Sequence, residues 1–180
     1  MGRLWIGHAE GLDLFDPRTE QIYFRWPDSG FQINSFGVHK LRVRRDGKIW
    51  ICTDQGVYVA EPETLNVEKF PQIPRETADI AETDDGSVVA ACWQQGLYYV
   101  DAKTGETTQF PRDQINLNGT VGQTIHGVTV DKMNRIWVAT PMGFELFNPS
   151  ERTFTQYPTN GIVFSIQAEP DGQIRVACGD

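Results

Sequence analysis

The three histidines of the chain, His8, His39 and His126, are its clearest candidates for metal or proton chemistry. Imidazole nitrogens and carboxylate oxygens are common ligands of divalent metal ions. If the histidines face one opening, they could hold one ion together with Glu10 and Asp54. A single histidine is more often a hydrogen-bonded loop residue. The interpretation that we adopt therefore contains no metal and no cofactor.

A second group of polar and aromatic residues suits ligand binding rather than catalysis. Trp93 is followed directly by Gln94 and Gln95. An indole ring can stack on the apolar face of a sugar while neighbouring amides bond to its hydroxyls. Trp93 could equally cover the edge of a neighbouring repeat. We assign no catalytic residue, and the predicted ligand-binding residues are Arg75, Trp93, Gln94, Gln95, Arg112 and His126.

These residues lie between the strands of a repeated unit. A Gly/Asn-x-aliphatic-Trp-aliphatic segment recurs, followed by a Gly-aliphatic-aromatic strand and an Asp/Glu/Asn-Pro turn. The copies start near residues 2, 47, 86, 134 and 172. A period of about forty residues with several short strands is typical of propeller blades. The sequence predicts an all-β fold, a β-propeller with about four four-stranded antiparallel blades, as one region over residues 1–180.

The second repeat shows how each unit is built. Alternating or apolar runs predict strands at residues 41–43, 49–53, 57–59 and 67–70, with Asp46-Gly47 as the first turn. Trp50 recurs as Trp5 and Trp137, which predicts a packing role between blades. The strand that follows begins with a glycine each time, which indicates a backbone requirement. Function must therefore come from the variable loops.

The chain begins and ends within the same strand of its repeat, so we expect an incomplete arc of a larger propeller. Such an arc exposes blade faces, and repeat arrays tolerate bare ends poorly. We therefore expect further blades or a second copy of the chain as partners. Two long loops, residues 28–38 and 111–124, rise at every second blade and are expected to contribute to the ligand-binding face.

Composition excludes several classes of protein. The net charge is −8 and lysines and arginines form no stripe, which argues against nucleic acid as a partner. Apolar runs are only a few residues long, so we predict no membrane segment. The N-terminus enters a repeat strand at once, so we expect no signal peptide within this chain. Cys52, Cys92 and Cys178 lie in different repeats and are expected to be buried free thiols.

The repeat resembles that of the two-component regulator propellers. The segment from Ile136-Trp137-Val138 to Phe147-Asn148-Pro149 carries the resemblance most closely, and the match covers essentially the whole chain. The resemblance implies a non-catalytic segment of the sensor propeller of a hybrid histidine kinase, located in the periplasm or outside the cell. It also implies a small-molecule or oligosaccharide ligand, most simply a glycan. The third and fifth repeats lack the tryptophan of this pattern.

Two enzyme families are the alternative. The run from His126-Gly127 to Trp137 resembles streptogramin lyase propellers, which need acidic residues where this chain has Thr124 and Thr140. A propeller of gluconolactonase type would need a divalent ion held by Glu, Asn and Asp, for which Glu10, Asp54 and Asn160 are candidates. Catalysis is the less favoured of the two functions.

Overall fold

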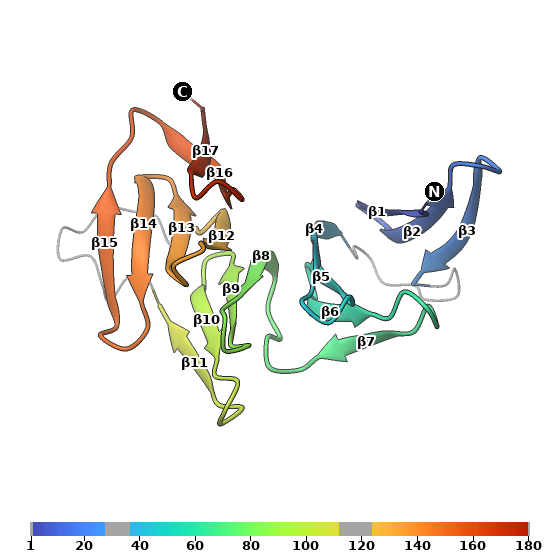
Figure 1. Cartoon of the computed structure of the whole chain (residues 1–180), viewed down its shortest axis with the longest axis horizontal. Coiled ribbons are helices and arrows are strands. Elements are labelled where there is room, and N and C mark those ends of the chain that lie inside the picture. Colours follow the sequence, from blue (N-terminus) through green and yellow to red (C-terminus); the bar gives the residue numbers. More distant parts are fainter. Residues whose placement is uncertain (1, 28–36, 112–123, 180) are drawn as a thin grey trace. The chain divides into compact units, whose positions relative to one another are not determined.

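The chain folds into short antiparallel strands joined by tight turns. The computed structural model describes residues 2–27, 37–111 and 124–179. Over these ranges seventeen strands form five antiparallel sheets (Figure 1). The strands fall into two compact units, residues 1–76 and 77–180, which are described separately. The described ranges include no helix with the length and apolarity needed to cross a membrane.

The first unit contains a three-stranded and a four-stranded sheet. The strands are β1 (Leu4–His8), β2 (Gly11–Asp16), β3 (Gln21–Trp26), β4 (Val38–Val43), β5 (Ile49–Thr53), β6 (Gly56–Ala60) and β7 (Val67–Phe70). Consecutive strands pair as hairpins, in the orders β1-β2-β3 and β4-β5-β6-β7. Strand β1 lies beside β4, and fully buried Leu12 and Ile51 belong to the core between the two sheets. Burial of such aliphatic side chains is the main stabilising contribution.

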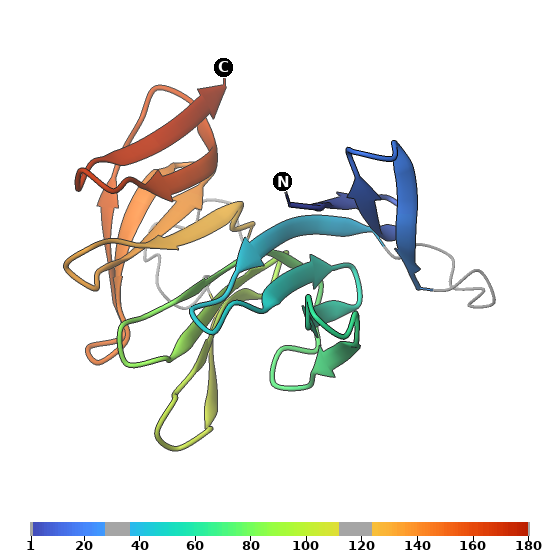
Figure 2. The ribbon, with the colours of Figure 1, turned by 45° about the vertical axis from the view of Figure 1, so that its right-hand side comes forward.

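The second unit contains two four-stranded sheets and a two-stranded sheet. The strands are β8 (Thr77–Glu82), β9 (Val88–Cys92), β10 (Gly96–Val100), β11 (Thr107–Phe110), β12 (Gly127–Val130), β13 (Ile136–Thr140), β14 (Gly143–Asn148), β15 (Thr153–Tyr157), β16 (Ile162–Ala168) and β17 (Ile174–Gly179). Strand β12 lies beside both β8 and β16, so the first strand of each sheet is the inner one (Figure 2).

The prediction of propeller blades is confirmed by this architecture. Each four-stranded sheet is a meander whose second strand is completely buried, as its apolar sequence on both faces requires. Trp50 and Trp137 are buried in β5 and β13. Trp137 packs against Val163 and Ile166 of the next sheet, so it joins blades as predicted. The inner strand β4 begins at Val38, three residues earlier than predicted.

The glycine at the start of each third strand is a backbone requirement. Gly56 has a φ of +108°, and a Cβ there would lie 2.6 Å from the carbonyl oxygen of Ile73. Gly96 has a φ of +82°, and its Cβ would lie 2.2 Å from the carbonyl oxygen of Phe110. Any side chain would therefore meet both strain and a backbone clash.

The cysteine prediction is correct for two residues and wrong for the third. All three thiols are free, and Cys52 and Cys92 are buried in the second strands of their blades. Cys178 is exposed, because β17 lies at the edge of a two-stranded sheet and most of its side chains face solvent.

Candidate functional site

In the inner strands β4, β8 and β16, one residue near the start of the strand stands outside the regular ladder. The pairing register of β4 shifts between Val38 and Lys40, which leaves His39 as the extra residue. The same shift makes Ala78 the extra residue of β8 and Phe164 the extra residue of β16. A β-bulge of this kind releases one residue from the ladder and redirects its side chain.

His126 occupies the same place in the blade that contains β12. The residue after it, Gly127, pairs with Ala139, just as Lys40 pairs with Cys52 in the earlier blade. We call the positions of His39, Ala78, His126 and Phe164 the bulge position. The side chain there differs from blade to blade, so the ladder does not determine its chemistry.

In the second unit two bulge-position side chains join an indole to form an aromatic row, which we define as Trp93, His126 and Phe164. The centroids of the Trp93 and His126 rings lie 5.8 Å apart. The rings of His126 and Phe164 are stacked, with centroids 5.5 Å apart and planes 13° from parallel. Trp93 is 38% exposed and Phe164 54% exposed, whereas His126 between them is half-buried, so the two ends of the row are open to solvent.

A tight turn holds Trp93 at the end of this row. The backbone N–H of Gln95 donates to the carbonyl oxygen of Cys92 at 3.3 Å, and Gln94 has a φ of +55°. The side chain of Gln109 donates from Nε2 to the carbonyl oxygen of Gln95 at 2.9 Å. Trp93 and Gln94 are exposed and Gln95 is half-buried, so the indole has amide groups beside it in sequence.

The buried carboxylate of Asp79 links the inner strands of the two blades that contain Trp93 and His126. Its Oδ2 accepts a hydrogen bond from the backbone N–H of Val128 at 3.3 Å, and its Oδ1 accepts one from Ile80 at 2.9 Å. A Cβ on Gly127 would lie 3.3 Å from the same Oδ2. The carboxylate therefore joins β8 to β12 through the backbone of Val128, two residues after His126.

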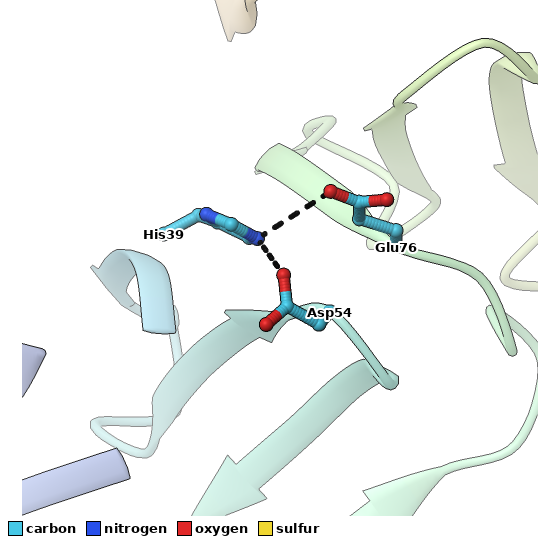
Figure 3. A group of neighbouring side chains, drawn as sticks. All are labelled: His39, Asp54 and Glu76. Carbon is cyan, nitrogen blue, oxygen red and sulfur yellow. Dashed lines mark hydrogen bonds and ion pairs between the residues drawn. The ribbon is translucent and has the colours of Figure 1, made fainter. Parts of the chain in front are cut away.

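In the first unit the bulge position has a different environment, which we call the His39 cluster: His39, Asp54 and Glu76. His39 Nε2 lies 2.7 Å from Asp54 Oδ1 and 3.8 Å from Glu76 Oε1 (Figure 3). The three groups come from the start of β4, the turn between β5 and β6, and the segment that follows β7. One nitrogen and two carboxylate oxygens thus converge within 4.8 Å of one another.

The predicted ligand-binding residues do not form one described group. Trp93 and His126 are brought together, and Gln94 and Gln95 follow Trp93 in its turn. Arg75 is exposed and belongs to the first unit. Arg112 lies outside the described residues. The ligand-binding assignment of all six stays a prediction.

The structure brings together only part of the residue set named for a shared ion site. The structure places His39 beside Asp54, as that alternative requires, but the third group is Glu76. His8 instead lies 3.6 Å from Asp13, and its Nδ1 accepts a hydrogen bond from the backbone N–H of Glu10. The hydrogen-bonded guanidinium of Arg25 holds the pKa of Asp13 below its usual range, so this carboxylate already has a cationic partner.

Sequence reasoning did not assign Phe164 or Glu76 to a site. Phe164 follows Val163 at the start of a strand, as His39 follows Val38, so alignment of the inner strands would have identified it. Glu76 immediately precedes β8, and only the fold of the preceding turn brings it to His39.

Open hollows lie at the other end of the strands, where the first and third turns of each blade are found. One hollow of the second unit has a volume of about 340 Å³ and is lined in part by Tyr99, Arg135 and Asn148. A ligand bound in this hollow would not touch the aromatic row. Substitutions in the row therefore tell whether a ligand binds at the row or in the hollow.

Solved structures share the fold of this chain at low sequence identity. The extracellular domain assigned to the hybrid two-component system BT3049 of B. thetaiotaomicron superposes with a TM-score of 0.75 and 20% identity, over 98% of this chain and 24% of that domain. Streptogramin B lyase gives a TM-score of 0.70 and 16% identity, over 97% of this chain and 58% of the enzyme. The gluconolactonase XC5397 of Xanthomonas campestris gives 0.71 and 16%, over 98% of this chain and 66% of the enzyme.

These similarities establish the β-propeller fold and no more, because a sensor domain and two enzymes share it about equally well. The predicted resemblance to two-component regulator propellers is confirmed at the level of the fold. The chain spans about a quarter of the length of the BT3049 domain. No protein-family model and no curated protein matches the sequence.

Proposed function

We propose that this chain is a segment of a β-propeller sensor that binds a small-molecule or oligosaccharide ligand, a glycan, and catalyses no reaction. It acts in the periplasm or outside the cell, as one propeller region with further blades or a second copy of the chain. The BT3049 domain supports this proposal, because it has the same fold and is an extracellular domain assigned to a hybrid two-component system.

The observation that carries the proposal is the aromatic row. Rings arranged across neighbouring blades and left open to solvent suit a flat ligand with apolar faces, which is the shape of a pyranose chain. The amides of Gln94 and Gln95 follow Trp93 and supply both donors and acceptors for hydroxyl groups. A rigid sheet beneath the row avoids part of the ordering cost of binding.

A lyase active site at His126 is less well supported. Metal-assisted lyase chemistry needs carboxylates near the catalytic imidazole. The stacked and tilted rings beside His126 are Phe164 and Trp93. Thr140, where the lyase pattern needs an acidic residue, is buried and its hydroxyl donates to the carbonyl oxygen of Gly143 at 2.9 Å.

The experiment is a titration of the chain with a panel of neutral oligosaccharides by isothermal calorimetry. We expect Trp93→Ala to weaken binding of the best oligosaccharide about fivefold or more, since each lost stacking contact is worth about 1 kcal/mol or more. Tyr157→Ala is the matched control, because Tyr157 is 39% exposed and its ring packs against Phe144 and Trp137.

Equal loss in both variants would contradict a site at the aromatic row. Unchanged binding in Trp93→Ala would place the glycan elsewhere, for instance at the hollow near Tyr99. Turnover of a lactone or a streptogramin that EDTA abolishes would overturn the assignment as a non-enzyme.

A further inference from the structure

We propose that the His39 cluster is a binding site for a divalent transition-metal ion of the Zn²⁺ class. This inference goes beyond the proposed function, because it concerns the first unit and requires no glycan. His39 supplies an imidazole nitrogen, and Asp54 and Glu76 supply one carboxylate oxygen each (Figure 3).

The distances within the cluster suit ligands of one ion. Zinc bonds of about 2.0–2.2 Å in a tetrahedral arrangement place neighbouring ligand atoms about 3.3–3.6 Å apart. The observed separations from His39 Nε2 are 2.7 Å to Asp54 and 3.8 Å to Glu76, on either side of that range. Rotation of the exposed Glu76 side chain and a small retreat of Asp54 would bring all three atoms into position.

The backbone already orients one of the carboxylates. Asp54 Oδ2 accepts a hydrogen bond from the backbone N–H of Gly37 at 2.8 Å, which turns Oδ1 toward His39. The N–H of Asp54 in turn donates to the carbonyl oxygen of Gly37 at 3.2 Å. Supporting hydrogen bonds of this kind fix the direction of metal ligands.

The same contact explains why residue 37 has no side chain. A Cβ on Gly37 would lie 2.7 Å from Asp54 Oδ2 and 3.4 Å from its Cγ. Any larger residue would displace the carboxylate from His39. Gly37 is therefore a positioning residue for the cluster.

The ligand types select the class of ion. One imidazole with two carboxylates suits Zn²⁺, Co²⁺ or Mn²⁺. Calcium prefers six to eight oxygen ligands, and magnesium keeps an all-oxygen octahedron with several waters. Three protein ligands leave at least one coordination position open to water or to an oxygen atom of a bound molecule.

The test uses the full chain with Cys178→Ser as the background, because Cys178 is an exposed thiol that could bind zinc by itself. Zn²⁺ is titrated in competition with a chromophoric chelator, and Co²⁺ is titrated in parallel to record its visible spectrum. We expect one equivalent of each ion to bind, with a cobalt spectrum free of thiolate charge transfer.

His39→Gln, Asp54→Asn and Glu76→Gln should each weaken Zn²⁺ binding about 100-fold or more, and Gly37→Ala, which acts through Asp54, should weaken it about tenfold. His8→Gln is the matched control, since His8 is also a histidine beside an aspartate in the same unit, and it should leave binding unchanged. Circular dichroism of each variant checks that the fold is retained.

Two results would overturn the proposal. The first is no Zn²⁺ binding, or binding that His39→Gln leaves unchanged. The second is a loss of Zn²⁺ affinity in His39→Gln and Asp54→Asn with full affinity in Glu76→Gln, which would exclude Glu76 as a ligand and contradict the three-ligand site. Because glycan binding is measured separately at the aromatic row, failure here leaves the proposed function intact.

Discussion

His39 and His126 occupy the same bulge position in two different blades, yet their surroundings are chemically opposite. His39 has two carboxylates within 3.8 Å, whereas His126 lies between the rings of Trp93 and Phe164. The backbone around both is nearly the same, because the residue that follows each pairs with the same position of the second strand. The repeat therefore sets where a side chain is presented, and a few loop residues decide what that side chain can do.

The largest expected effect separates the two roles of tryptophan in the second unit. Trp137→Ala should lower the free energy of unfolding by about 3–5 kcal/mol, because the indole is 7% exposed and packs against the next blade. Trp93→Ala should cost only about 1 kcal/mol, since its ring is substantially exposed. Urea denaturation of both variants checks this, and equal losses would show that Trp93 is scaffold.

The next effect concerns the close approach that shapes the turn after Trp93. Gly96→Ala should destabilise the chain by about 2–4 kcal/mol, because positive φ and a clash with the Phe110 carbonyl act together. Gly86→Ala is the control for strain alone, since its φ of +85° is similar but its Cβ would meet only Ala102 at 3.7 Å. In urea denaturation, the free energy of unfolding of that control should fall by roughly 1 kcal/mol. Equal losses of stability in Gly96→Ala and Gly86→Ala would show that the clash with the Phe110 carbonyl adds nothing to the backbone strain.

Asp131 stabilises the blade that presents His126. Its carboxylate accepts hydrogen bonds from Trp137 Nε1 at 2.9 Å and Arg135 Nε at 2.7 Å. Burial by itself would raise the pKa of Asp131, but these hydrogen bonds and those from the backbone outweigh it and hold the pKa below its usual value. In the first unit the equivalent turn residue, Arg44, instead stacks over Trp50 at 4.2 Å.

Asp131→Asn should therefore lower stability by about 2 kcal/mol at pH 7, with a defined pH dependence. Because the folded-state pKa is depressed, the stabilisation is present above the unfolded value of about 3.9 and is lost as pH falls through the folded-state pKa. The difference between parent and variant should shrink below about pH 4. Urea denaturation of both proteins across this range measures it, and a constant difference would contradict the assignment.

Replacing either histidine by phenylalanine should change the free energy of unfolding least, by no more than about 0.5 kcal/mol. These two variants test the contrast between His39 and His126 most directly. His126→Phe keeps a ring in the aromatic row, so oligosaccharide binding should be retained. His39→Phe removes the nitrogen ligand, so Zn²⁺ binding should be lost. Titrations of each variant with both ligands form the full test. Loss of glycan binding in His126→Phe would assign the imidazole a polar role that stacking does not supply.

Much of the scaffold could be predicted because it repeats. The strand from Ile49 to Thr53 was located to the residue, and burial of Trp137 followed from its place in the pattern. The bulge was not predicted. One extra residue shifts the pairing between neighbouring strands, but it hardly changes the alternation of apolar and polar residues along the sequence. The environment of His39 depends on Glu76, whose approach follows from tertiary turn geometry.

The bulge has a practical consequence for protein engineering. Its residue is outside the register of the ladder, so exchanging it should leave the pairing of the inner strand unchanged. A gene library randomised only at codons 39, 126 and 164 would then vary recognition chemistry, whereas Ala78 is kept because it is buried and a larger side chain there would overpack the core. Such a library could retarget the blades toward new ligands without redesign of the protein backbone.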